Sequence, residues 1–279
     1  MIATRETLTD HRKTSTGKKL AFASIERLLV KFDSISLPEM QNVSLLDRMD
    51  TKYVMGMSQF YTVLEAVQEQ YRVLCVNQTR LNHYQTIYFD TPNFTLYHQH
   101  HNQLRSRYKV RARKYIDSNL TFFEVKRKTN RDRTVKTRLQ IPDVVMQLNG
   151  QIDEFVDTCF PFTVRDLEPK LWNQFVRITL VSKHHPERLT IDLNLEFGWG
   201  EAYGALPGIV IAEVKQENTS QPSDFVRQMR QFGIRPTPFS KYCIGVCTLY
   251  NSVKSNYFKP QLRLVGKVMQ EELAHGSIY

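Results

Sequence analysis

Alternating apolar and polar positions dominate the middle of the chain and predict β-strands. Runs of this kind, separated by turn signals, predict strands at 83–89, 104–115, 120–128, 134–141, 174–182, 188–195 and 209–215. Asp117-Ser118-Asn119 and Asn130-Arg131-Asp132 separate the second, third and fourth of these runs, and such residues are typical of turns. The three strands are therefore expected to pair as an antiparallel meander.

Three other segments carry apolar residues at helical spacing. The first runs from Ala21 to Phe32 and shows a single apolar stripe. The second follows Ser58, which is expected to be its N-cap. The third follows Ser223 and is expected to end at Gly233.

The arrangement of these elements predicts one α+β domain. The 279-residue chain is 41% hydrophobic and 24% charged, which is typical of a folded protein. It shows no internal repeat and no low-complexity linker, so a single domain is expected at 21–254. A mobile polar tail at 1–20 and a basic C-terminal extension at 255–279 are expected on either side of it.

Each predicted strand has a charged face and an apolar face, because side chains alternate along a strand. In the strand at 104–115, one face carries Arg105, Arg107, Lys109, Arg111 and Arg113, and the other carries Tyr108, Val110 and Ala112. The charged faces of the other strands carry Glu124, Lys126 and Lys128; Lys136 and Arg138; Arg177; Arg188 and Asp192; and Glu213 and Lys215.

Two arrangements of such strands fit this pattern. In an open sheet the charged face contacts water. In a closed barrel helices cover the apolar outside and the charges line the interior, where like charges about 7 Å apart repel by roughly 2 kcal/mol. The bias recurs on several strands, and Glu124 and Glu213 stand among the bases, so the closed barrel is favoured. Such an interior would hold an anion of high charge density.

The positive charge is concentrated in one part of the chain. The sequence has 38 Lys and Arg against 28 Asp and Glu, and residues 105–138 contain 13 of the bases and 3 of the acids. The rest of the chain is balanced, and such a concentration of one sign indicates a polyanionic partner. Tyr108 and Phe123 fall opposite the charges, which argues against base stacking and therefore against a nucleic-acid partner.

Other features indicate a cytoplasmic protein. No run of 18 apolar residues predicts a membrane span, and the N-terminus lacks a secretory pattern. The cysteines form no Cys-x-x-Cys pair, and Cys243 and Cys247 are expected to be core thiols. His98, His100 and His101 are interpreted as one face of a short helix in preference to a zinc site. Gly198-Trp199-Gly200 is interpreted as a turn, since the third glycine of a dinucleotide fingerprint is absent.

Six short motifs occur in an order that resembles a known family. They are Leu46-Asp47-Arg48-Met49-Asp50-Thr51-Lys52-Tyr53, Tyr88-Phe89-Asp90-Thr91-Pro92, Lys109-Val110-Arg111-Ala112-Arg113, Phe123-Glu124-Val125-Lys126, Ile211-Ala212-Glu213-Val214-Lys215 and Ser240-Lys241-Tyr242. Together they resemble the VTC domain, the polyphosphate polymerase domain of vacuolar transporter chaperone complexes and their bacterial relatives. The resemblance extends from about Arg27 to Arg263 and places the chain among the triphosphate tunnel metalloenzymes.

The resemblance implies a closed, eight-stranded antiparallel barrel with a basic lumen and helices packed outside. It also implies an enzyme that transfers the γ-phosphate of ATP onto inorganic polyphosphate with Mn²⁺ or Mg²⁺. By correspondence with the family, the tunnel cations are Lys52, Arg111, Arg113, Lys126, Arg177, Arg188 and Lys241. The metal-binding carboxylate corresponds to Glu213, which Glu124 is expected to assist.

Further residues are expected to contact phosphate less directly, and they are Arg48, Arg107, Lys109, Lys128, Arg138 and Lys215. Asp192 is expected to orient Arg188 or Arg177 and not to bind metal. No general base is expected, because the attacking phosphate oxygen is already ionised.

Two alternative functions remain open at this stage. A triphosphatase with the same fold would use the same cations to hydrolyse triphosphate or nucleoside triphosphate. A non-catalytic module would bind polyphosphate through the basic segment alone. The chain shows neither the phosphate-sensing domain nor the membrane segments of the eukaryotic complexes. A membrane-protein partner that holds the protein at the inner membrane face is therefore left open.

Overall fold

The computed structural model describes residues 16–41, 48–130, 133–162, 164–217 and 223–275. One eleven-stranded sheet organises these residues, and its main path runs β2-β11-β9-β8-β4-β5-β6-β7. In chain order, the strands of this path are β2 (Arg48–Gly56), β4 (Asn82–Asp90), β5 (Arg107–Tyr115), β6 (Leu120–Lys128), β7 (Thr134–Ile141), β8 (Glu168–Ser182), β9 (Glu187–Trp199) and β11 (Ile209–Glu217). The short strands β1 (Asp33–Ile35), β3 (Tyr71–Leu74) and β10 (Ala202–Leu206) lie off the path.

Every strand of the main path pairs antiparallel with its neighbours. The predicted meander is confirmed, because β5 pairs with β6 and β6 pairs with β7. The strand expected from residue 104 begins at Arg107, so Arg105 precedes it. Gly198 and Trp199 belong to β9, and only Gly200, with φ +56°, adopts a turn conformation. Arg131 and Asp132 of the second predicted turn lie outside the described residues.

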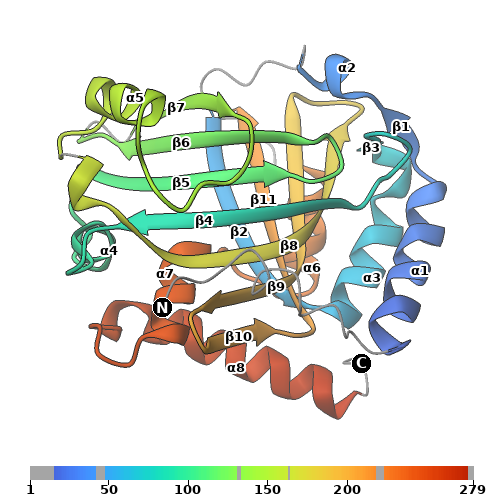
Figure 1. Ribbon diagram of the computed structural model, residues 1–279. Coiled ribbons are helices and arrows are strands. Elements are labelled where there is room, and N and C mark those ends of the chain that lie inside the picture. The colour runs from blue at the N-terminus through green and yellow to red at the C-terminus, as the bar shows by residue number, and fades with distance from the viewer. Residues whose placement is uncertain (1–15, 42–47, 131–132, 163, 218–222, 276–279) are drawn as a thin grey trace.

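Helices surround this sheet (Figure 1). They are α1 (Thr16–Val30), α2 (Leu37–Gln41), α3 (Met57–Ala66), α4 (Thr95–His101), α5 (Gln151–Cys159), α6 (Asp224–Gln231), α7 (Lys241–Leu249) and α8 (Lys259–Ala274). Three of them correspond to predicted helices. The prediction for α6 is confirmed, since this helix begins directly after Ser223 and ends just before Gly233; the Ser223 hydroxyl also caps it by accepting a hydrogen bond from the Val226 amide. The expected N-cap of α3 was wrong: Gly56 occupies that position, and the Ser58 hydroxyl instead donates to Glu272 of α8 at 2.5 Å.

Helices α1, α3, α5 and α6 pack against the apolar face of the sheet, which we call the outer face. Helices α1, α3 and α6 cover one half of it through a core that includes Leu29, Phe60, Phe225, Ile178 and Val210. Helix α5 covers the other half through a second core that includes Val156, Val110, Ala112, Phe123 and Val125. The charged side chains therefore project from the opposite side, which we call the inner face.

The sheet is open, so the expectation of a closed eight-stranded barrel is corrected. The main path does contain eight strands, but β2 and β7 end it and do not pair with each other among the described residues. Strand β7 is mostly exposed, and the Val135 side chain on it is 51% exposed. The sheet nevertheless curves strongly, since β4 to β7 run across β2, β11 and β9 in Figure 1. The inner face is therefore concave.

Helices α7 and α8 close one end of this concave face. Ile209 and Ile211 of β11 and Phe197 of β9 form one core with Val246 of α7 and Val265 of α8. Helix α7 approaches the sheet closely, since a Cβ on Gly245 would lie 2.6 Å from the Phe197 ring. Apolar side chains therefore occupy this end of the inner face, and the charged side chains lie on the rest of it.

Both expected flanking segments differ from the structure where it describes them. Residues 16–20, expected in a mobile tail, form the first part of α1. Most of the segment expected as an extension beyond residue 254 forms α8, which contributes Val265 and Val268 to the core. Glu272 of α8 is 2% exposed and accepts hydrogen bonds from the backbone amide of Ser58 at 3.3 and 3.2 Å. The end of α8 is therefore held against the start of α3.

Candidate functional site

Most of the predicted cations lie together on the inner face. They come from β2, β5, β6, β8, β11 and the first residue of α7, and they are Lys52, Lys109, Arg111, Arg113, Lys126, Arg177, Lys215 and Lys241. Cross-strand register places Lys109 beside Lys126 and Arg111 beside Glu124. Register also places Lys52 beside Glu213 on the distant part of the sheet.

The curvature brings the two ends of the sheet within electrostatic reach of each other. Burial, together with the charges of Lys109 and Lys52, lowers the pKa of Lys126 to about 7. Lys126 lies on β6 and Lys52 on β2, which are separated by most of the sheet path. The cations of the inner face therefore form one electrostatic group.

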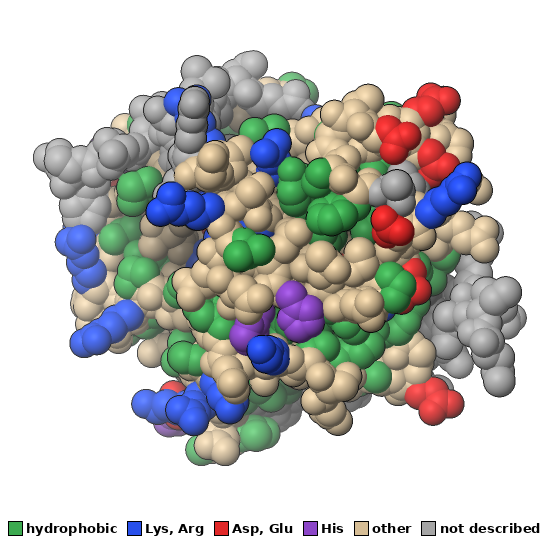
Figure 2. Space-filling view, turned by 90° about the vertical axis from the view of Figure 1, so that its left-hand side faces the viewer, with side chains coloured by type: hydrophobic (Ala, Val, Ile, Leu, Met, Phe, Trp, Pro, Cys, Tyr) green, Lys and Arg blue, Asp and Glu red, His purple; other side chains and the backbone are tan. Residues whose placement is uncertain are grey.

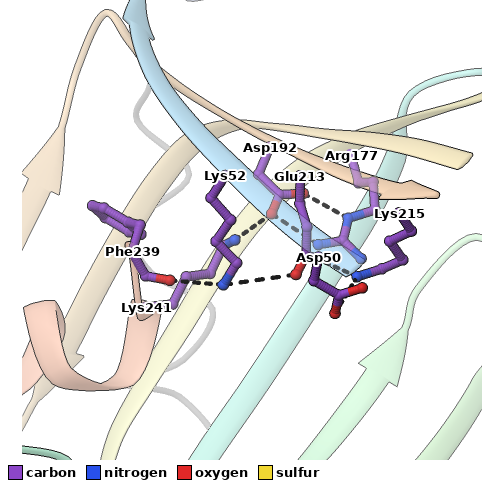
Figure 3. Close-up of polar contacts among 8 residues, drawn as sticks. All are labelled: Asp50, Lys52, Arg177, Asp192, Glu213, Lys215, Phe239 and Lys241. Atoms are coloured by element: carbon purple, nitrogen blue, oxygen red, sulfur yellow. Dashed lines mark hydrogen bonds and ion pairs between the residues drawn. The ribbon is translucent and has the colours of Figure 1, made fainter. Parts of the chain in front are cut away.

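Asp192 holds two of the predicted cations in fixed positions (Figure 3). Arg177 donates from Nε and Nη2 to the two oxygens of this carboxylate, at 2.6 and 2.8 Å. Lys241 donates to the same group. Burial of Asp192 raises its pKa, but Arg177 and Lys241 outweigh burial and lower the pKa to about 2. These contacts agree with the expectation that Asp192 orients Arg177.

Glu213 lies between two lysines. Lys215 forms an ion pair with this carboxylate at 2.9 Å and Lys52 at 3.7 Å, and Lys215 also pairs with Asp50 at 3.2 Å. Lys52 Nζ donates to the backbone oxygen of Phe239 at 2.7 Å, just before α7. Burial of Glu213 raises its pKa, but Lys52 and Lys215 outweigh burial and hold the pKa well below its usual value. Glu213 is therefore ionised at neutral pH.

Glu124 is the most enclosed of these carboxylates, at 1% exposure. Arg111 donates to it from Nε at 2.7 Å, and Lys136 forms an ion pair with it. Burial raises the pKa of Glu124, but Arg111 and Arg113 outweigh burial and lower it. Since both neighbours already engage this carboxylate, it fixes the Arg111 guanidinium on the inner face.

Three cations of the inner face have no ion-pair partner among the described residues, and they are Lys109, Arg113 and Lys126. Arg113 is 5% exposed, and within the described part of the chain its hydrogen-bond acceptor is the Thr86 hydroxyl, at 3.0 Å. Burial, offset in part by Cys243 and reinforced by Lys52, lowers the pKa of Lys109. The energetic conflict among these like charges would be relieved by an anion.

Aromatic rings also line the inner face, which corrects one premise of the argument against base stacking. Tyr84 and Phe175 stack with ring centroids 5.1 Å apart. The guanidinium of Arg113 lies over both rings, at 5.6 and 5.5 Å, and Arg177 lies over the same two rings. Tyr108 and Phe123 do pack in the outer core as expected. The faces of Tyr84 and Phe175 are thus occupied by cations.

The remaining predicted residues lie near the ends of strands or on β7. Arg48 begins β2, and Arg107 pairs by register with Lys128 where β5 begins and β6 ends. Arg188 on β9 lies opposite Lys215. Arg138 on β7 places its guanidinium 4.6 Å from the centre of the Phe122 ring.

Sequence reasoning left Lys136, Tyr84, Tyr88 and Phe175 out of the site. Lys136 shares the charged face of β7 with Arg138, so the alternation pattern was sufficient to include it. The aromatic residues carry no charge, so the charge pattern of the sequence does not identify them. Their position follows from the register of β4 against β5 and β8, which a single sequence does not disclose.

The donor set bears directly on the metal that the resemblance implies. Among the described residues, no group of three or more His, Cys, Asp or Glu side chains is arranged to hold a metal ion. Glu213 is a single ionised carboxylate on the inner face. Mg²⁺ and Mn²⁺ commonly bind one or two carboxylates and complete their shells with substrate phosphates and water. The site fits a metal shared with a phosphate ligand, which Glu213 would hold.

The histidine and cysteine predictions concern α4 and α7. His98, His100 and His101 lie on the short helix α4, as expected. The His100 ring nitrogen Nε2 lies 3.0 Å from the Tyr108 carbonyl oxygen, and burial lowers the pKa of His100 to about 2. Cys243 is fully buried, and the Cys247 sulfur lies 3.2 Å from the Tyr97 hydroxyl. Both cysteines belong to the core around α7, as predicted.

The surface at the α4 end of the molecule is divided by charge (Figure 2). Histidines lie near the centre of this view, Lys and Arg lie mainly on one side, and carboxylates gather at the upper right on the other. Within the described residues no helix combines the length and apolar character needed to cross a membrane.

Comparison with protein families matches residues 47–250 to the VTC domain. The chain therefore belongs to the VTC domain family. No curated protein matches the chain.

Several solved structures resemble the chain at low identity. A putative adenylate cyclase from Bacillus halodurans is 11% identical with a TM-score of 0.45, covering 70% of this chain and 94% of that one. The putative adenylyl cyclase HpAC1 from Hippeastrum, described as having a dominant triphosphatase activity, is 13% identical with a TM-score of 0.45, covering 71% of this chain and 96% of that one. The PH1819 protein from Pyrococcus horikoshii is 14% identical with a TM-score of 0.41, covering 73% and 99%.

Proposed function

We propose that the protein is a polyphosphate polymerase that transfers the γ-phosphoryl group of ATP onto a growing inorganic polyphosphate chain. The observation that carries the proposal is the ionised carboxylate of Glu213, which lies between Lys52 and Lys215 on the inner face. A site that only binds a polyanion would use such a carboxylate to hold cations in place. A site that also positions a metal on the phosphates needs one. Membership of the VTC domain family supports the same reading.

The reaction needs little covalent chemistry from the protein. An ionised terminal oxygen of the polyphosphate chain attacks the γ-phosphorus of ATP, a new P–O–P bond forms, and the bond to ADP breaks. Arg111, Arg113 and Arg177 would contact phosphate oxygens through their planar guanidinium groups. Glu124 and Asp192 hold the guanidinium groups of Arg111 and Arg177 in place before substrate arrives.

A bound divalent metal would supply positive charge that stabilises the phosphate oxygens in the transition state of phosphoryl transfer. Glu213 would hold that metal, and Lys52 and Lys215 would hold Glu213. Lys241, beside Asp192, would carry positive charge near the phosphates. These residues would act by position and charge, so the proposed reaction requires no catalytic dyad.

The proposal is tested by incubating the purified protein with ATP and Mn²⁺ and separating the products on a gel. A ladder of long anionic polymer is the expected result. Orthophosphate without polymer would instead identify a triphosphatase. Polyphosphate binding without turnover would identify a non-catalytic module.

The metal assignment is tested with Glu213→Ala. Polymer synthesis should be lost, while polyphosphate binding without metal should be retained, because the substitution removes a negative charge from the inner face. Glu271→Ala is the control, since Glu271 is an exposed glutamate on α8 that pairs only with Lys267 among the described residues. Polymer synthesis by Glu213→Ala at the wild-type rate would show that the metal lies elsewhere.

A further inference from the structure

Tyr88 is a buried tyrosine on the inner face with no role in the mechanism above. We propose that its hydroxyl group donates a hydrogen bond to the phosphate chain, in addition to the contacts of the cations. This inference rests on the proposed function, because it assumes that a phosphate chain occupies the inner face. It concerns a binding contact only, and it applies whether the bound chain is extended or hydrolysed.

The position of Tyr88 follows from the register of β4 against β5. Tyr88 lies directly opposite Arg111, and Thr86 of the same β4 face lies opposite Arg113 and accepts a hydrogen bond from it. The Tyr88 side chain therefore lies beside Arg111 and diagonally across from Arg113, the two arginines that correspond to the Arg-x-Arg strand of the family. An anion that contacts Arg111 on the inner face would lie near this hydroxyl.

The Tyr88 ring is held in place before a ligand binds. It stacks on the ring of Tyr242 from α7, with centroids 5.1 Å apart and an interplanar angle of 28°. The Tyr242 hydroxyl donates to Asp90. Asp90 also accepts hydrogen bonds from the backbone amides of Leu96 and Tyr97 at 2.8 and 2.7 Å, which ties the stack to α4. Such preorganisation reduces the entropy lost when a ligand binds.

The Tyr88 hydroxyl has no hydrogen-bond acceptor among the described residues, unlike several other buried tyrosines. Tyr242 donates to Asp90, Tyr71 to Glu187, and Tyr250 to the backbone of Lys170. The Tyr88 side chain is 3% exposed, yet its oxygen is not among the fully buried oxygens that lack a partner. The hydroxyl therefore keeps contact with solvent on the inner face and is able to donate to a ligand.

The charges around Tyr88 favour an anion at this position. Burial raises the pKa of Tyr88, but nearby cations outweigh burial and lower the pKa to about 8. These cations are Arg111, Arg113 and Lys109 of β5 and Lys241 of α7. Tyr84 of the same strand face provides the contrast, because burial raises its pKa despite Arg177. The field that favours a phenolate at Tyr88 also favours a phosphate oxygen beside it.

Binding of inorganic triphosphate, measured by calorimetry without metal, tests the proposal directly. Tyr88→Phe keeps the stacked ring and removes only the hydroxyl. At pH 7 it is expected to weaken triphosphate binding about tenfold, which is typical for a hydrogen bond to a charged group. Tyr203→Phe is the matched control, because Tyr203 is 48% exposed on β10, and its affinity should equal that of the wild type.

The pH dependence of this difference separates a phosphate contact from a structural role. Above pH 8 a phenolate at Tyr88 is unable to donate and repels phosphate, so the advantage of the wild type over Tyr88→Phe should disappear by pH 9. Titration of the lysines of the inner face affects both proteins and cancels in the ratio. The groups that face Tyr88 are Lys109, Arg111, Arg113, Lys241 and Tyr242, with Asp90 behind Tyr242.

The outcomes are distinguishable from failure of the proposed function. Equal triphosphate affinity of the wild type and Tyr88→Phe at pH 7 would overturn the inference alone. Absence of triphosphate binding by the wild type would overturn both proposals. If Tyr88→Phe fails to fold, the inference is tested by following the ionisation of the wild-type tyrosines with pH through their ultraviolet absorbance. Bound triphosphate should raise the midpoint of the ionisation step near pH 8. A midpoint that triphosphate does not change would overturn the inference.

Discussion

The inner face contains two groups of cations that differ in how their charge is balanced. The paired group is Lys52, Arg111, Arg177, Lys215 and Lys241, each of which forms an ion pair with Glu213, Glu124, Asp50 or Asp192. The unpaired group is Lys109, Arg113 and Lys126 on β5 and β6, which have no ion pair among the described residues. The two groups interact electrostatically, since the charge of Lys52 lowers the pKa of both Lys109 and Lys126.

The difference indicates that the two groups of cations have different roles within one site. Paired cations keep their geometry without ligand, because each carboxylate fixes the groups that it contacts. Unpaired cations raise the free energy of the empty protein, and an anion relieves that penalty when it binds. The paired group therefore supplies position, and the unpaired group supplies affinity and its dependence on pH.

Asp192→Asn should have the largest effect, because it removes the charge that balances Arg177 and Lys241. Breaking one partner of a buried ion pair costs about 3–5 kcal/mol of unfolding free energy. The Asp192 side chain is 4% exposed and its partners are 16% and 12% exposed, so solvent compensates little. Urea denaturation of the variant and wild type measures the difference, with Glu271→Gln as a surface control.

The loss of stability at acid pH provides an independent test of the role of Asp192. The pKa of Asp192 is lowered to about 2, so its stabilisation is present above pH 4 and is lost as the pH falls towards 2. The free energy of unfolding of Asp192→Asn should therefore fall less than that of the wild type as the pH is lowered from 4 towards 2. A stability loss below about 1 kcal/mol at pH 7, within the range of exposed pairs, would contradict the assignment of Asp192 to the paired group.

Lys109→Met should act in the opposite direction on stability and should reduce binding. Burial lowers the pKa of Lys109, which means that its charge is unfavourable in the empty site. Removing the charge should raise the denaturation midpoint and weaken triphosphate binding about 10–100-fold, as expected for a charged phosphate contact. Calorimetry and thermal denaturation measure the two effects. Lower stability of the variant would show that Lys109 has a partner in the folded protein.

The sequence predicted the charged inner face well, and the reason is local. Alternation along a strand depends only on neighbouring residues, so Arg111 and Arg113 could be assigned to one face and Val110 and Ala112 to the other. The outer core confirms that assignment. The start of α6 directly after Ser223 was also predicted from local residues alone.

Closure of the sheet and the pairing of charges could not be predicted in the same way. Whether β2 reaches β7 depends on strand tilt and length over the entire sheet path. The partners of Lys241 and Lys52 are 49 and 161 residues away in sequence, at Asp192 and Glu213. Strand β2 itself was missed as a strand, because its alternation mixes Met49, Asp50 and Thr51 without a clear apolar face.

The unpaired group should make anion binding depend on pH. The pKa of Lys126 is lowered to about 7, so this lysine is mostly neutral in the free protein at pH 8. A bound polyanion favours the charged form, so binding should take up protons, and triphosphate affinity should fall between pH 6.5 and pH 9. Calorimetry in buffers of different ionisation enthalpy measures this uptake.

The same lysine sets the sign of its contribution to the pH dependence of folding. Unfolded lysine keeps its proton to about pH 10.4, so between pH 7 and 10 the unfolded chain binds more protons than the folded one at Lys126. This residue therefore makes the free protein more stable as the pH rises through that window. Lys126→Met should reduce both the proton uptake and this pH dependence. If Lys126→Met took up as many protons as the wild type on binding triphosphate, the group that gains the proton would not be Lys126.

Arg138→Gln should have the smallest effect and should define the limit of the site. Arg138 lies on the exposed end strand β7 and stacks on the Phe122 ring, so solvent screens its charge. Exposed charge interactions contribute about 0.2–1 kcal/mol, which corresponds to less than about fivefold in triphosphate affinity. The denaturation midpoint should not change. A loss comparable to that of Lys109→Met would mean that the ligand extends to β7 and that the open side of the sheet forms part of the binding site.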